Sequence, residues 1–184
     1  MPRTVAFLRG INLGKRRIKM DRLRALFEEI GFDNVSTFIA SGNVLFESKT
    51  RDDLKLAQQI ESHLAKSLGY EVDTFVRTLA EVVEIAAFQP FSKADLANPA
   101  NTIHVGLAKK AFAPETIRKL LACRTEVDEF RVSGREFYWL CRIKSHESKV
   151  WTTLPMKVVA LPSTTQRNIT TLQKLAALAA VLAV

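Results

Sequence analysis

The residues best suited to chemistry lie in a short segment near the N-terminus. Residues 9–19 read RGINLGKRRIK and combine two glycines, one amide side chain and a run of basic side chains. An apolar run precedes this segment and a helical pattern follows it. A glycine-bearing loop ahead of a helix can direct backbone N–H groups and partial positive charge at one point. The segment therefore predicts an anion site, with the candidate ligand-binding residues Arg9, Gly10, Asn12, Lys15 and Lys19.

This segment matches neither of the two common phosphate-binding motifs. The P-loop needs four residues between its glycines and a hydroxyl residue after its lysine. Only three residues separate Gly10 from Gly14, and Arg16 stands where the hydroxyl should be. The dinucleotide fingerprint G-x-G-x-x-G is also absent, so nucleotide hydrolysis by either device is not predicted. The alternative to an anion site is that the glycines allow tight turns and the charges face water.

A second polar group lies in the turn of a predicted hairpin. In a βαββαβ arrangement the third strand is antiparallel to the first and adjacent to it, so it starts where the first strand ends. We therefore expect this turn to lie near Arg9 and Asn12. The alternative is a turn whose polar side chains only bond the backbone. The candidate residues here are Ser41, Gly42 and Asn43.

A third group of polar residues is spread over the C-terminal part of the chain. A serine beside a lysine can be an activated nucleophile, but neighbours on a helix do not face one another. A separate lysine such as Lys157 could activate Ser148 instead. Arg167 and Asn168 precede the terminal helix and fit an anion contact or a helix cap. The candidates of this group are Ser148, Lys149, Lys157, Thr165, Arg167 and Asn168.

The histidines and cysteines do not form a metal or redox site in the sequence. His63, His104 and His146 are scattered and lack ligand spacing, and His104 fits a structural position within a strand. Cys123 and Cys141 have no second cluster near them, so we expect them to be reduced and buried, as in a cytosolic protein. The sequence predicts no metal and no cofactor.

The charge of the chain is unevenly distributed along its 184 residues, with a net of +8. Residues 1–24 hold eight basic and one acidic side chain, residues 25–92 five basic and eleven acidic, and residues 93–184 fourteen basic and seven acidic. A basic face that meets nucleic acid or a phosphorylated ligand fits this distribution. An ordinary solvated surface with excess lysine and arginine fits it too.

The apolar runs near the two ends of the chain are short. The run 5–8 is too short for the apolar region of a signal peptide. The run 175–184 falls short of the roughly 20 residues that a membrane-spanning helix needs. We therefore expect no membrane segment and a cytoplasmic protein with a buried terminal helix.

Hydrophobic periodicity predicts an α+β fold made of two similar halves. The first half has the order βαββαβ, which is the ferredoxin-like arrangement. A further helix at 78–87 begins with Thr78 and Glu81 at capping-box spacing and ends before Pro90. The six elements of the βαββαβ unit are predicted at 3–9, 20–30, 35–39, 44–46, 53–68 and 70–77.

The second half repeats this order less clearly after a connecting loop at 92–100. Two ferredoxin-like halves, 1–90 and 91–184, therefore indicate an internal duplication followed by a C-terminal helix. A Ser-Gly pair at a turn of each half, at offset 92, supports this only weakly because both residues favour turns. The predicted elements are a strand at 102–107, a helix at 114–121, a hairpin of 126–132 with 136–141, a helix at 148–159, a short or irregular strand at 162–167 and a helix at 170–182. Pro155 breaks the pattern of the helix at 148–159 unless the helix begins there.

Several short motifs follow one another along the chain. They are LRGINLG at 8–14 with IKM at 18–20, SGNV at 41–44, PF at 90–91, HV at 104–105, SK at 148–149 and Lys157 with TQRN at 165–168. In this order they resemble the bacterial family known as domain of unknown function 1697. The resemblance implies a compact cytosolic α/β protein with ferredoxin-like halves and no established biochemical role. The family usually has an aromatic residue after its Arg-Asn pair, where this chain has Ile169, which cannot stack on a ligand as a ring would.

The sequence favours a protein that binds a phosphate-bearing ligand or nucleic acid through a basic polar site. A second hypothesis is an enzyme acting on a small phosphorylated or carboxylated metabolite, which predicts a closed pocket and a shifted pKa. A third is a homo-oligomeric interaction module, in which the sheet or the terminal helix pairs two subunits as a homodimer. No pattern in the chain specifies a reaction, so no catalytic residue is assigned.

Overall fold

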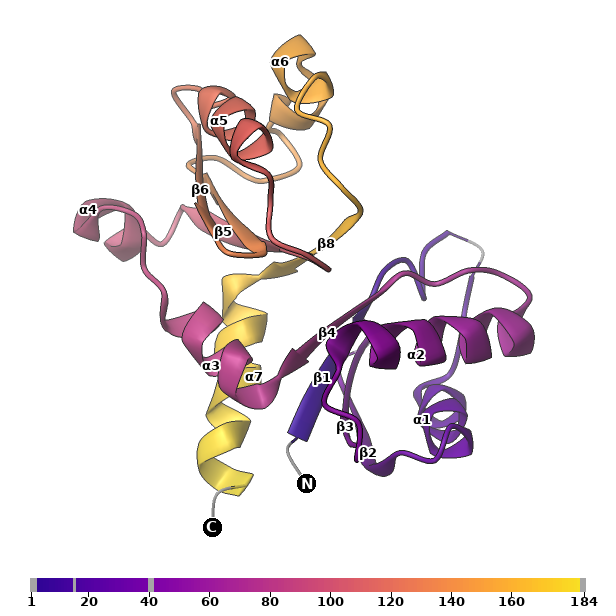
Figure 1. The fold of residues 1–184 in the computed structure, drawn as a ribbon. Coiled ribbons are helices and arrows are strands. Elements are labelled where there is room, and N and C mark those ends of the chain that lie inside the picture. The colour runs from indigo at the N-terminus through magenta and orange to yellow at the C-terminus, as the bar shows by residue number, and fades with distance from the viewer. Residues whose placement is uncertain (1–2, 15, 40–41, 183–184) are drawn as a thin grey trace. The chain divides into compact units, whose positions relative to one another are not determined.

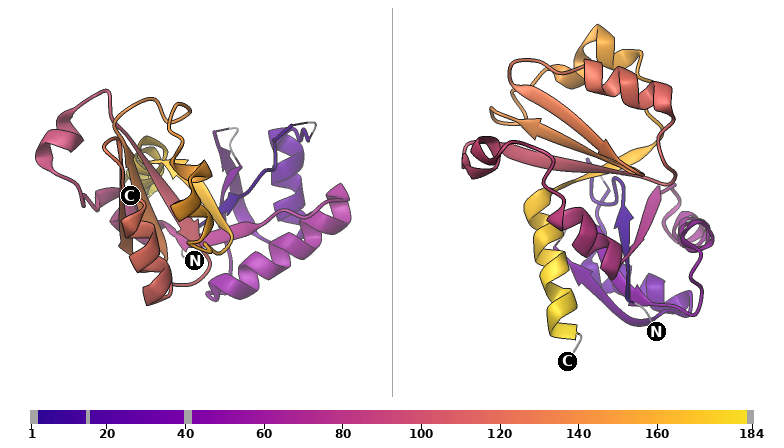
Figure 2. Two further views of the ribbon diagram at one scale, coloured as in Figure 1. Left: turned by 90° about the horizontal axis from the view of Figure 1, so that it is seen from above. Right: turned by 60° about the vertical axis from the view of Figure 1, so that its left-hand side comes forward.

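The structure is a computed structural model that describes residues 3–14, 16–39 and 42–182. It contains two compact units, one made of Met1–Val83 with Leu175–Val184 and the other of Glu84–Lys174. Each unit is built on its own four-stranded antiparallel sheet (Figures 1 and 2). Among the described helices, none combines the length and the apolar character needed to cross a membrane. The predicted domain boundary at residue 90 stays a prediction.

The first unit has the βαββαβ order that the sequence predicts. Its strands lie in the order β2-β3-β1-β4, and each neighbouring pair is antiparallel. This is the ferredoxin-like arrangement, with β1 and β3 at the centre. The elements are β1 (Arg3–Leu8), α1 (Met20–Glu29), β2 (Asp33–Phe38), β3 (Asn43–Glu47), α2 (Asp53–Leu68) and β4 (Thr74–Thr78), with α3 (Leu79–Ala87) following directly.

The second unit repeats the order and adds a short helix before it. Its strands lie in the order β6-β7-β5-β8, again with antiparallel neighbours. The α+β fold with a duplicated βαββαβ pattern and a C-terminal helix is therefore confirmed. The elements are α4 (Lys93–Ala97), β5 (Thr102–Ala108), α5 (Pro114–Ala122), β6 (Asp128–Ser133), β7 (Glu136–Cys141), the 3₁₀ turn η1 (Val150–Thr152), α6 (Leu154–Lys157), β8 (Thr164–Asn168) and α7 (Ile169–Leu182).

Local sequence signals set several helix boundaries. The Asp52 carboxylate accepts hydrogen bonds from the N–H groups of Leu54 and Lys55 at 3.0 and 3.1 Å, which caps the start of α2. Gly69 ends α2 in the left-handed conformation, with φ +76°. The capping box of Thr78 and Glu81 is confirmed, because each side chain accepts a hydrogen bond from the other residue's backbone N–H.

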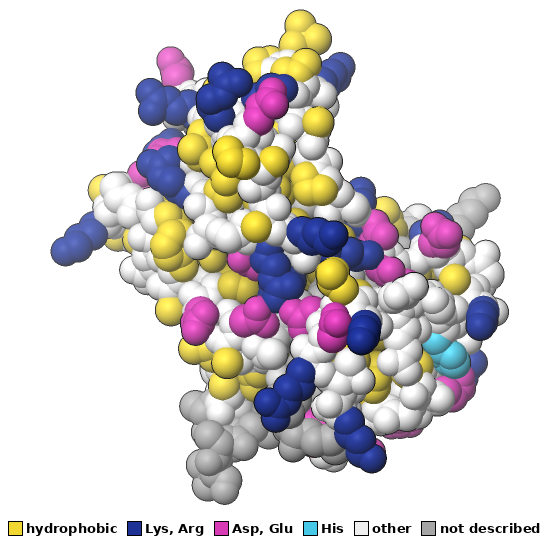
Figure 3. Space-filling model, in the orientation of Figure 1, with side chains coloured by type: hydrophobic (Ala, Val, Ile, Leu, Met, Phe, Trp, Pro, Cys, Tyr) yellow, Lys and Arg dark blue, Asp and Glu magenta, His cyan; other side chains and the backbone are white. Residues whose placement is uncertain are grey.

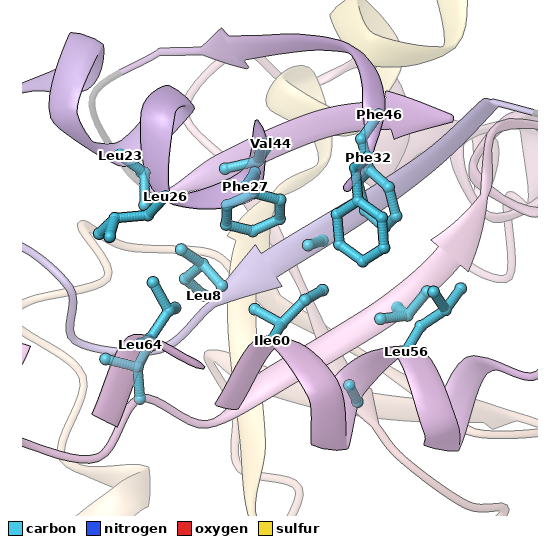
Figure 4. Close-up of a cluster of buried hydrophobic side chains, with 14 of the residues drawn as sticks. Leu8, Leu23, Leu26, Phe27, Phe32, Val44, Phe46, Leu56, Ile60 and Leu64 are labelled. Atoms are coloured by element: carbon cyan, nitrogen blue, oxygen red, sulfur yellow. The ribbon is translucent and has the colours of Figure 1, made fainter. Parts of the chain in front are cut away.

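The core of the first unit lies between one face of its sheet and the helices α1 and α2 (Figure 4). Phe46 projects from β3 and stacks on Phe32 at 4.4 Å between ring centroids, while Phe27 of α1 meets its edge at 5.7 Å. Each fully buried side chain of this size contributes about 1.5–3 kcal/mol to folding. Periodic apolar residues on both helices thus fix the sheet face against which they pack.

The core of the second unit is formed by one face of its sheet with α5, η1 and α6, which lie over that face in Figure 2. Trp151 of η1 packs edge-on against Phe130 of β6 and Trp139 of β7, at 5.7 and 5.3 Å between ring centroids. The continuous helix at 148–159 is wrong, whereas the alternative of a helix that begins at Pro155 lies within one residue of the start of α6. Pro155 lacks an N–H and is tolerated only in a first helical turn, so the chain forms η1 and then restarts as α6.

Equivalent strands of the two sheets pair in the same register, so residues of the two halves can be matched one to one. Val5 of β1 pairs with Leu45 and Arg77, and Val105 of β5 pairs with Tyr138 and Arg167. In this register the two Ser-Gly pairs are not equivalent. Asn43 pairs with Phe38, whereas its counterpart Glu136 pairs with Ser133, so the first hairpin turn is two residues longer. The duplication rests on topology and register rather than on these turns.

At one equivalent pair of positions, a smaller residue on one strand is matched by a larger residue on the neighbouring strand. Ala6 pairs with Val44 in the first unit, and the equivalent residues of the second unit are Gly106 and Phe137. A Cβ atom at Gly106 would meet the Phe137 ring at 2.0 Å. The large ring of one strand therefore occupies the space that the missing side chain of its neighbour leaves.

We predict that Gly106→Ala lowers the free energy of unfolding by about 1–3 kcal/mol, because a well-packed core accepts no extra methyl group. Combining it with Phe137→Val, which restores the residue types of the first unit, should cost less than the sum of the two single changes. Urea unfolding of the four proteins measures this coupling. Additive costs would show that the ring and the glycine are energetically independent.

Candidate functional site

The predicted anion-binding segment begins where β1 is held between its two neighbouring strands. The N–H of Leu8 donates to the carbonyl oxygen of Gly42 at 2.8 Å, and the N–H of Arg9 donates to that of Asp73 at 2.9 Å. Phe7 pairs with Asn43. The expected approach of the 41–43 turn to the end of β1 is therefore confirmed for Gly42 and Asn43, while Ser41 lies outside the described residues.

The backbone after β1 folds into a loop that its own side chains hold. The side-chain oxygen of Asn12 accepts a hydrogen bond from the N–H of Ile18 at 2.8 Å, and Arg17 donates to the carbonyl oxygen of Asn12 at 3.2 Å. Gly10 and Gly14 adopt positive φ angles of +70° and +62°. Asn12 thus closes the loop, and the glycines supply turns that other residues adopt only with strain.

Ile11 anchors this loop to the β2–β3 turn. Its side chain is buried, and a Cβ atom added to Gly42 would lie 2.7 Å from the Ile11 methyl group. Gly42 also has a φ of +76°. The residue is glycine for two reasons, a left-handed backbone and the close approach of a neighbouring side chain. Neither reason requires a ligand.

Asn43 is fully buried at the start of β3 rather than open to solvent. Its amide nitrogen donates to the carbonyl oxygen of Phe38 at 3.0 Å and so spans the hairpin turn. This is the backbone-bonding role that was the alternative to ligand binding at this turn. Any ligand at the end of β1 would meet the loop before it met Asn43.

The exposed charges of the loop are arginine and lysine side chains. Residues 9–14 and 16–19 are called the basic loop below; Lys15 lies outside the described residues. Arg9 pairs with Asp73 at 3.7 Å, with both side chains about half exposed. The guanidinium carbon of Arg16 lies 4.3 Å from the centre of the Tyr70 ring, a cation–π contact. Arg17 and Lys19 are exposed beside them.

A shallow hollow of about 370 Å³ borders the basic loop. Arg9, Gly10, Leu13 and Arg16 line it from the loop, and Glu71 and Asp73 line it from the segment between α2 and β4. Leu13 is 73% exposed at the tip of the loop. The hollow therefore offers two guanidinium groups, two carboxylates and one apolar contact to a partner.

The predicted site residues of the second unit fall on two sides of its sheet. The Ser148 hydroxyl donates to Asp128 at 2.8 Å, and the indole N–H of Trp139 donates to the same carboxylate oxygen at 2.8 Å. Asp128 is buried, so the three groups satisfy one another. Ser148 thereby holds the chain before η1 to the sheet. The exposed Lys149 follows it, and its carbonyl oxygen accepts from Thr152.

Thr165 and Arg167 lie on the opposite face of that sheet from Lys157. Arg167 pairs with Val105, so the two side chains lie on the same face of the sheet. Val105 is three residues from the core residue Ala108 in β5, so it faces the side opposite the core and α6. The Arg167 guanidinium donates to the Thr165 hydroxyl at 2.8 Å, and burial lowers its pKa to about 10. The sheet thus separates this pair from Lys157, and no single site of the second unit joins all three.

Asn168 caps α7. Its side-chain oxygen accepts a hydrogen bond from the N–H of Thr170 at 2.9 Å and another from the Thr170 hydroxyl at 2.8 Å. The equivalent position of the first unit is Thr78, which caps α3. Of the two roles considered for Asn168, the structure shows the helix cap.

The sequence model of the family described as "Protein of unknown function (DUF1697)" matches residues 1–138 of the chain. The match covers the Met1–Val83 part of the first unit, including the basic loop and the hairpin turn, and continues into β7. The chain belongs to this family. The family resemblance that the sequence motifs indicated is thus confirmed for this DUF1697 protein. No curated protein matches the chain.

A solved structure shares the fold of this DUF1697 protein. The conserved bacterial protein SP0830 from Streptococcus pneumoniae matches with a TM-score of 0.74 and 19% sequence identity. The alignment covers 97% of this chain and 98% of that one. At this identity the match shows a common fold.

Several residues of this DUF1697 protein that shape its candidate sites were not predicted. The Asp128 carboxylate accepts hydrogen bonds from Thr125, Trp139 and Ser148, which only the structure brings together. Arg77 is a fully buried cation whose guanidinium donates to the carbonyl oxygen of Val76 at 2.7 Å. An arginine among apolar strand residues is the one sequence signal that could have marked Arg77. Over the part of the chain that the structure describes, no group of three or more histidine, cysteine or acidic side chains could hold a metal ion.

The second unit of the DUF1697 protein also contains a charged network that spans distant parts of the chain. Arg142 donates to Asp95 at 2.8 and 3.0 Å and to Glu129 at 2.7 Å. Hydrogen bonds from Arg142 and Ser92 lower the pKa of Asp95 to about 2. Asp95 and Arg142 are 47 residues apart, so this network ties α4 to the end of β7.

We predict that Gly42→Ala destabilises the protein more than Gly69→Ala does. Both glycines have a φ of +76°, but only the Cβ atom at Gly42 would meet a neighbour, since nothing lies within 4 Å of the one at Gly69. The control should lose about 1–2 kcal/mol for the left-handed backbone. The Gly42 variant should lose about 1–3 kcal/mol more for overpacking. Equal losses in urea unfolding would mean that Ile11 yields without cost.

We predict that the stability provided by Asp95 depends on pH with a definite sign. The pKa of Asp95 is depressed in the folded protein, so its contribution is present above the ordinary value near 3.8 and disappears as the pH falls through about 2. Wild type should therefore exceed Asp95→Asn in unfolding free energy at neutral pH and converge with it near the lower value. Glu115→Gln, which removes an exposed carboxylate, is the control and should differ little at any pH. If wild type and Asp95→Asn still differ in unfolding free energy near pH 2, the difference does not come from the ionisation of Asp95.

Proposed function

We propose that this DUF1697 protein binds a phosphate-bearing partner, nucleic acid in particular, through the basic loop. The observation that carries the proposal is a cluster of exposed basic side chains on a backbone that is already fixed. Asn12, Ile11 and the two loop glycines hold the loop without any ligand. The backbone of the loop therefore needs little further ordering when the cations meet an anion.

The chemistry of the loop suits an extended polyanion better than a single small anion. Its cations spread along the loop from Arg9 to Lys19 rather than meeting in an enclosed cavity. Two carboxylates, Glu71 and Asp73, share the hollow with Arg9, so one small anion would gain little net attraction there. A chain of phosphates can contact the exposed guanidinium groups of Arg9, Arg16 and Arg17 in succession.

The surrounding surface restricts where such a partner would bind. On the face drawn in Figure 3, basic side chains are interspersed with acidic ones and form no continuous basic surface. Arg16 over the Tyr70 ring also presents a flat cationic surface, on which an unstacked base can lie. The proposal is therefore a local contact with a single-stranded or exposed segment of nucleic acid in the cytoplasm. The two free buried cysteines fit that compartment.

We predict that the protein binds a labelled single-stranded oligonucleotide with an affinity that falls as salt rises from about 50 to 200 mM, since phosphate contacts release counterions. Arg9→Ala combined with Arg16→Ala should weaken binding and reduce the slope of log K against log salt by about 1–2. Fluorescence anisotropy over a salt series measures both quantities.

The matched control is Lys110→Ala combined with Arg124→Ala, which removes the same charge from exposed positions of the second unit. This pair should leave the salt slope nearly unchanged. Absence of binding at low salt, or an equal loss in both double variants, would contradict a role for the basic loop. Tighter binding of a small phosphorylated compound than of the oligonucleotide would replace nucleic acid with a metabolite as the partner.

A further inference from the structure

A second hollow, of about 430 Å³, lies entirely within the second unit. It is enclosed by the segment after α3, by α4, by the start of β5 and by the first turn of α7. The antiparallel pairing of His104 with Asn168 brings the last two together, because the chain entering β5 then runs beside the chain leaving β8. In Figure 1 the chain between α3 and β5 loops outward to α4 and returns. This hollow is called the α4 pocket below.

The α4 pocket has an aromatic wall that is held in place. Phe88 is 42% exposed, and its ring packs on Tyr138 at 5.0 Å between centroids with a tilt of 57°. Tyr138 is itself buried and donates to the carbonyl oxygen of Ile85 at 3.2 Å. The pocket therefore presents a positioned ring with a free surface, which is suited to stacking a flat ligand.

One polar atom of the pocket is buried without a partner. The Thr102 hydroxyl oxygen is inaccessible to solvent and has no hydrogen-bond partner among the described residues. Leaving such a group unsatisfied destabilises the folded protein. Thr102 lines the α4 pocket, but its oxygen has almost no accessible surface, so it belongs to the wall of the pocket and is not a contact for a ligand.

The remaining polar groups of the pocket are almost all uncharged amides. Gln89, Asn101 and Gln173 line it. The side-chain N–H of Asn101 donates to the carbonyl oxygen of Asp95, so its side-chain oxygen can accept a hydrogen bond from a ligand. The only charged lining residue is Asp95, which Arg142 engages with two hydrogen bonds. The pocket thus offers donors and acceptors but no cation to hold a phosphate or carboxylate.

We propose that the α4 pocket binds an uncharged purine base, in the form of a nucleoside such as adenosine. Amide side chains match the donor–acceptor edge of adenine, and an aromatic ring stacks on its face. The volume is in the range of pockets that enclose small molecules. The site is distinct from the basic loop, and adenosine carries no phosphate, so this proposal stands or falls independently of the proposed function.

Isothermal titration with adenosine tests the proposal. Phe88→Ala should weaken adenosine binding about tenfold, the size of one lost base-stacking contact. Leu154→Ala is the matched control, because it also shortens an exposed apolar side chain of the second unit and lies outside the pocket. It should bind adenosine as the wild type does.

Gln173→Ala separates a binding role from a structural one. Gln173 is exposed and lines the pocket, so adenosine binding should weaken about fivefold while the thermal unfolding midpoint stays level. Gln58→Ala, at an exposed helical glutamine outside the pocket, should leave adenosine binding unchanged. No heat of binding with millimolar adenosine would overturn the proposal. Equally strong binding of glucose, or full affinity in both pocket variants, would overturn it as well.

Discussion

The basic loop depends on the approach of Ile11 to Gly42. This contact pins the backbone that follows the central strand β1 to the turn that precedes β3, its neighbour in the sheet. Because the N–H groups of Leu8 and Arg9 already donate to Gly42 and Asp73, just before β3 and β4, the loop leaves the sheet from a fixed point. Asn12 then closes it from within. Ile11 and Ile18 pack on the core, while the arginine and lysine side chains of the loop are exposed.

The duplicated fold shows how two halves can keep one topology while their cores diverge. Each half places a buried arginine, Arg77 or Arg167, at the same register on its outer strand, and each guanidinium donates to the carbonyl oxygen of the preceding residue. Each half also starts a helix immediately after that strand. The crossover helices differ, since the sixteen-residue α2 corresponds to a 3₁₀ turn and the four-residue α6. The backbone framework has been kept more strictly than the elements that cover it.

How far the sequence predicted this protein depended on the range of the interactions involved. The order of helices and strands along the chain, the capping box of Thr78 and Glu81 and the helix that ends at residue 68 follow from residues a few positions apart, so they were visible in the sequence. The placing of Gly42 beside β1 followed from topology. The bond of Ser148 to Asp128 and that of Arg142 to Asp95 join residues 20 and 47 positions apart, and no local pattern announces them. The same holds for the α4 pocket, which depends on β5 pairing with β8.

The grouping of Leu175–Val184 with Met1–Val83 has a consequence for how the chain folds during synthesis. The first unit is one body in space but two pieces in sequence, separated by the whole of the second unit. On a ribosome, residues 84–174 emerge before the last segment of the first unit does. The sheet, the helices α1 and α2 and the buried core of the first unit all come from residues 3–78, so they can form before the second unit emerges. Only the addition of Leu175–Val184 to the first unit has to follow the synthesis of the second.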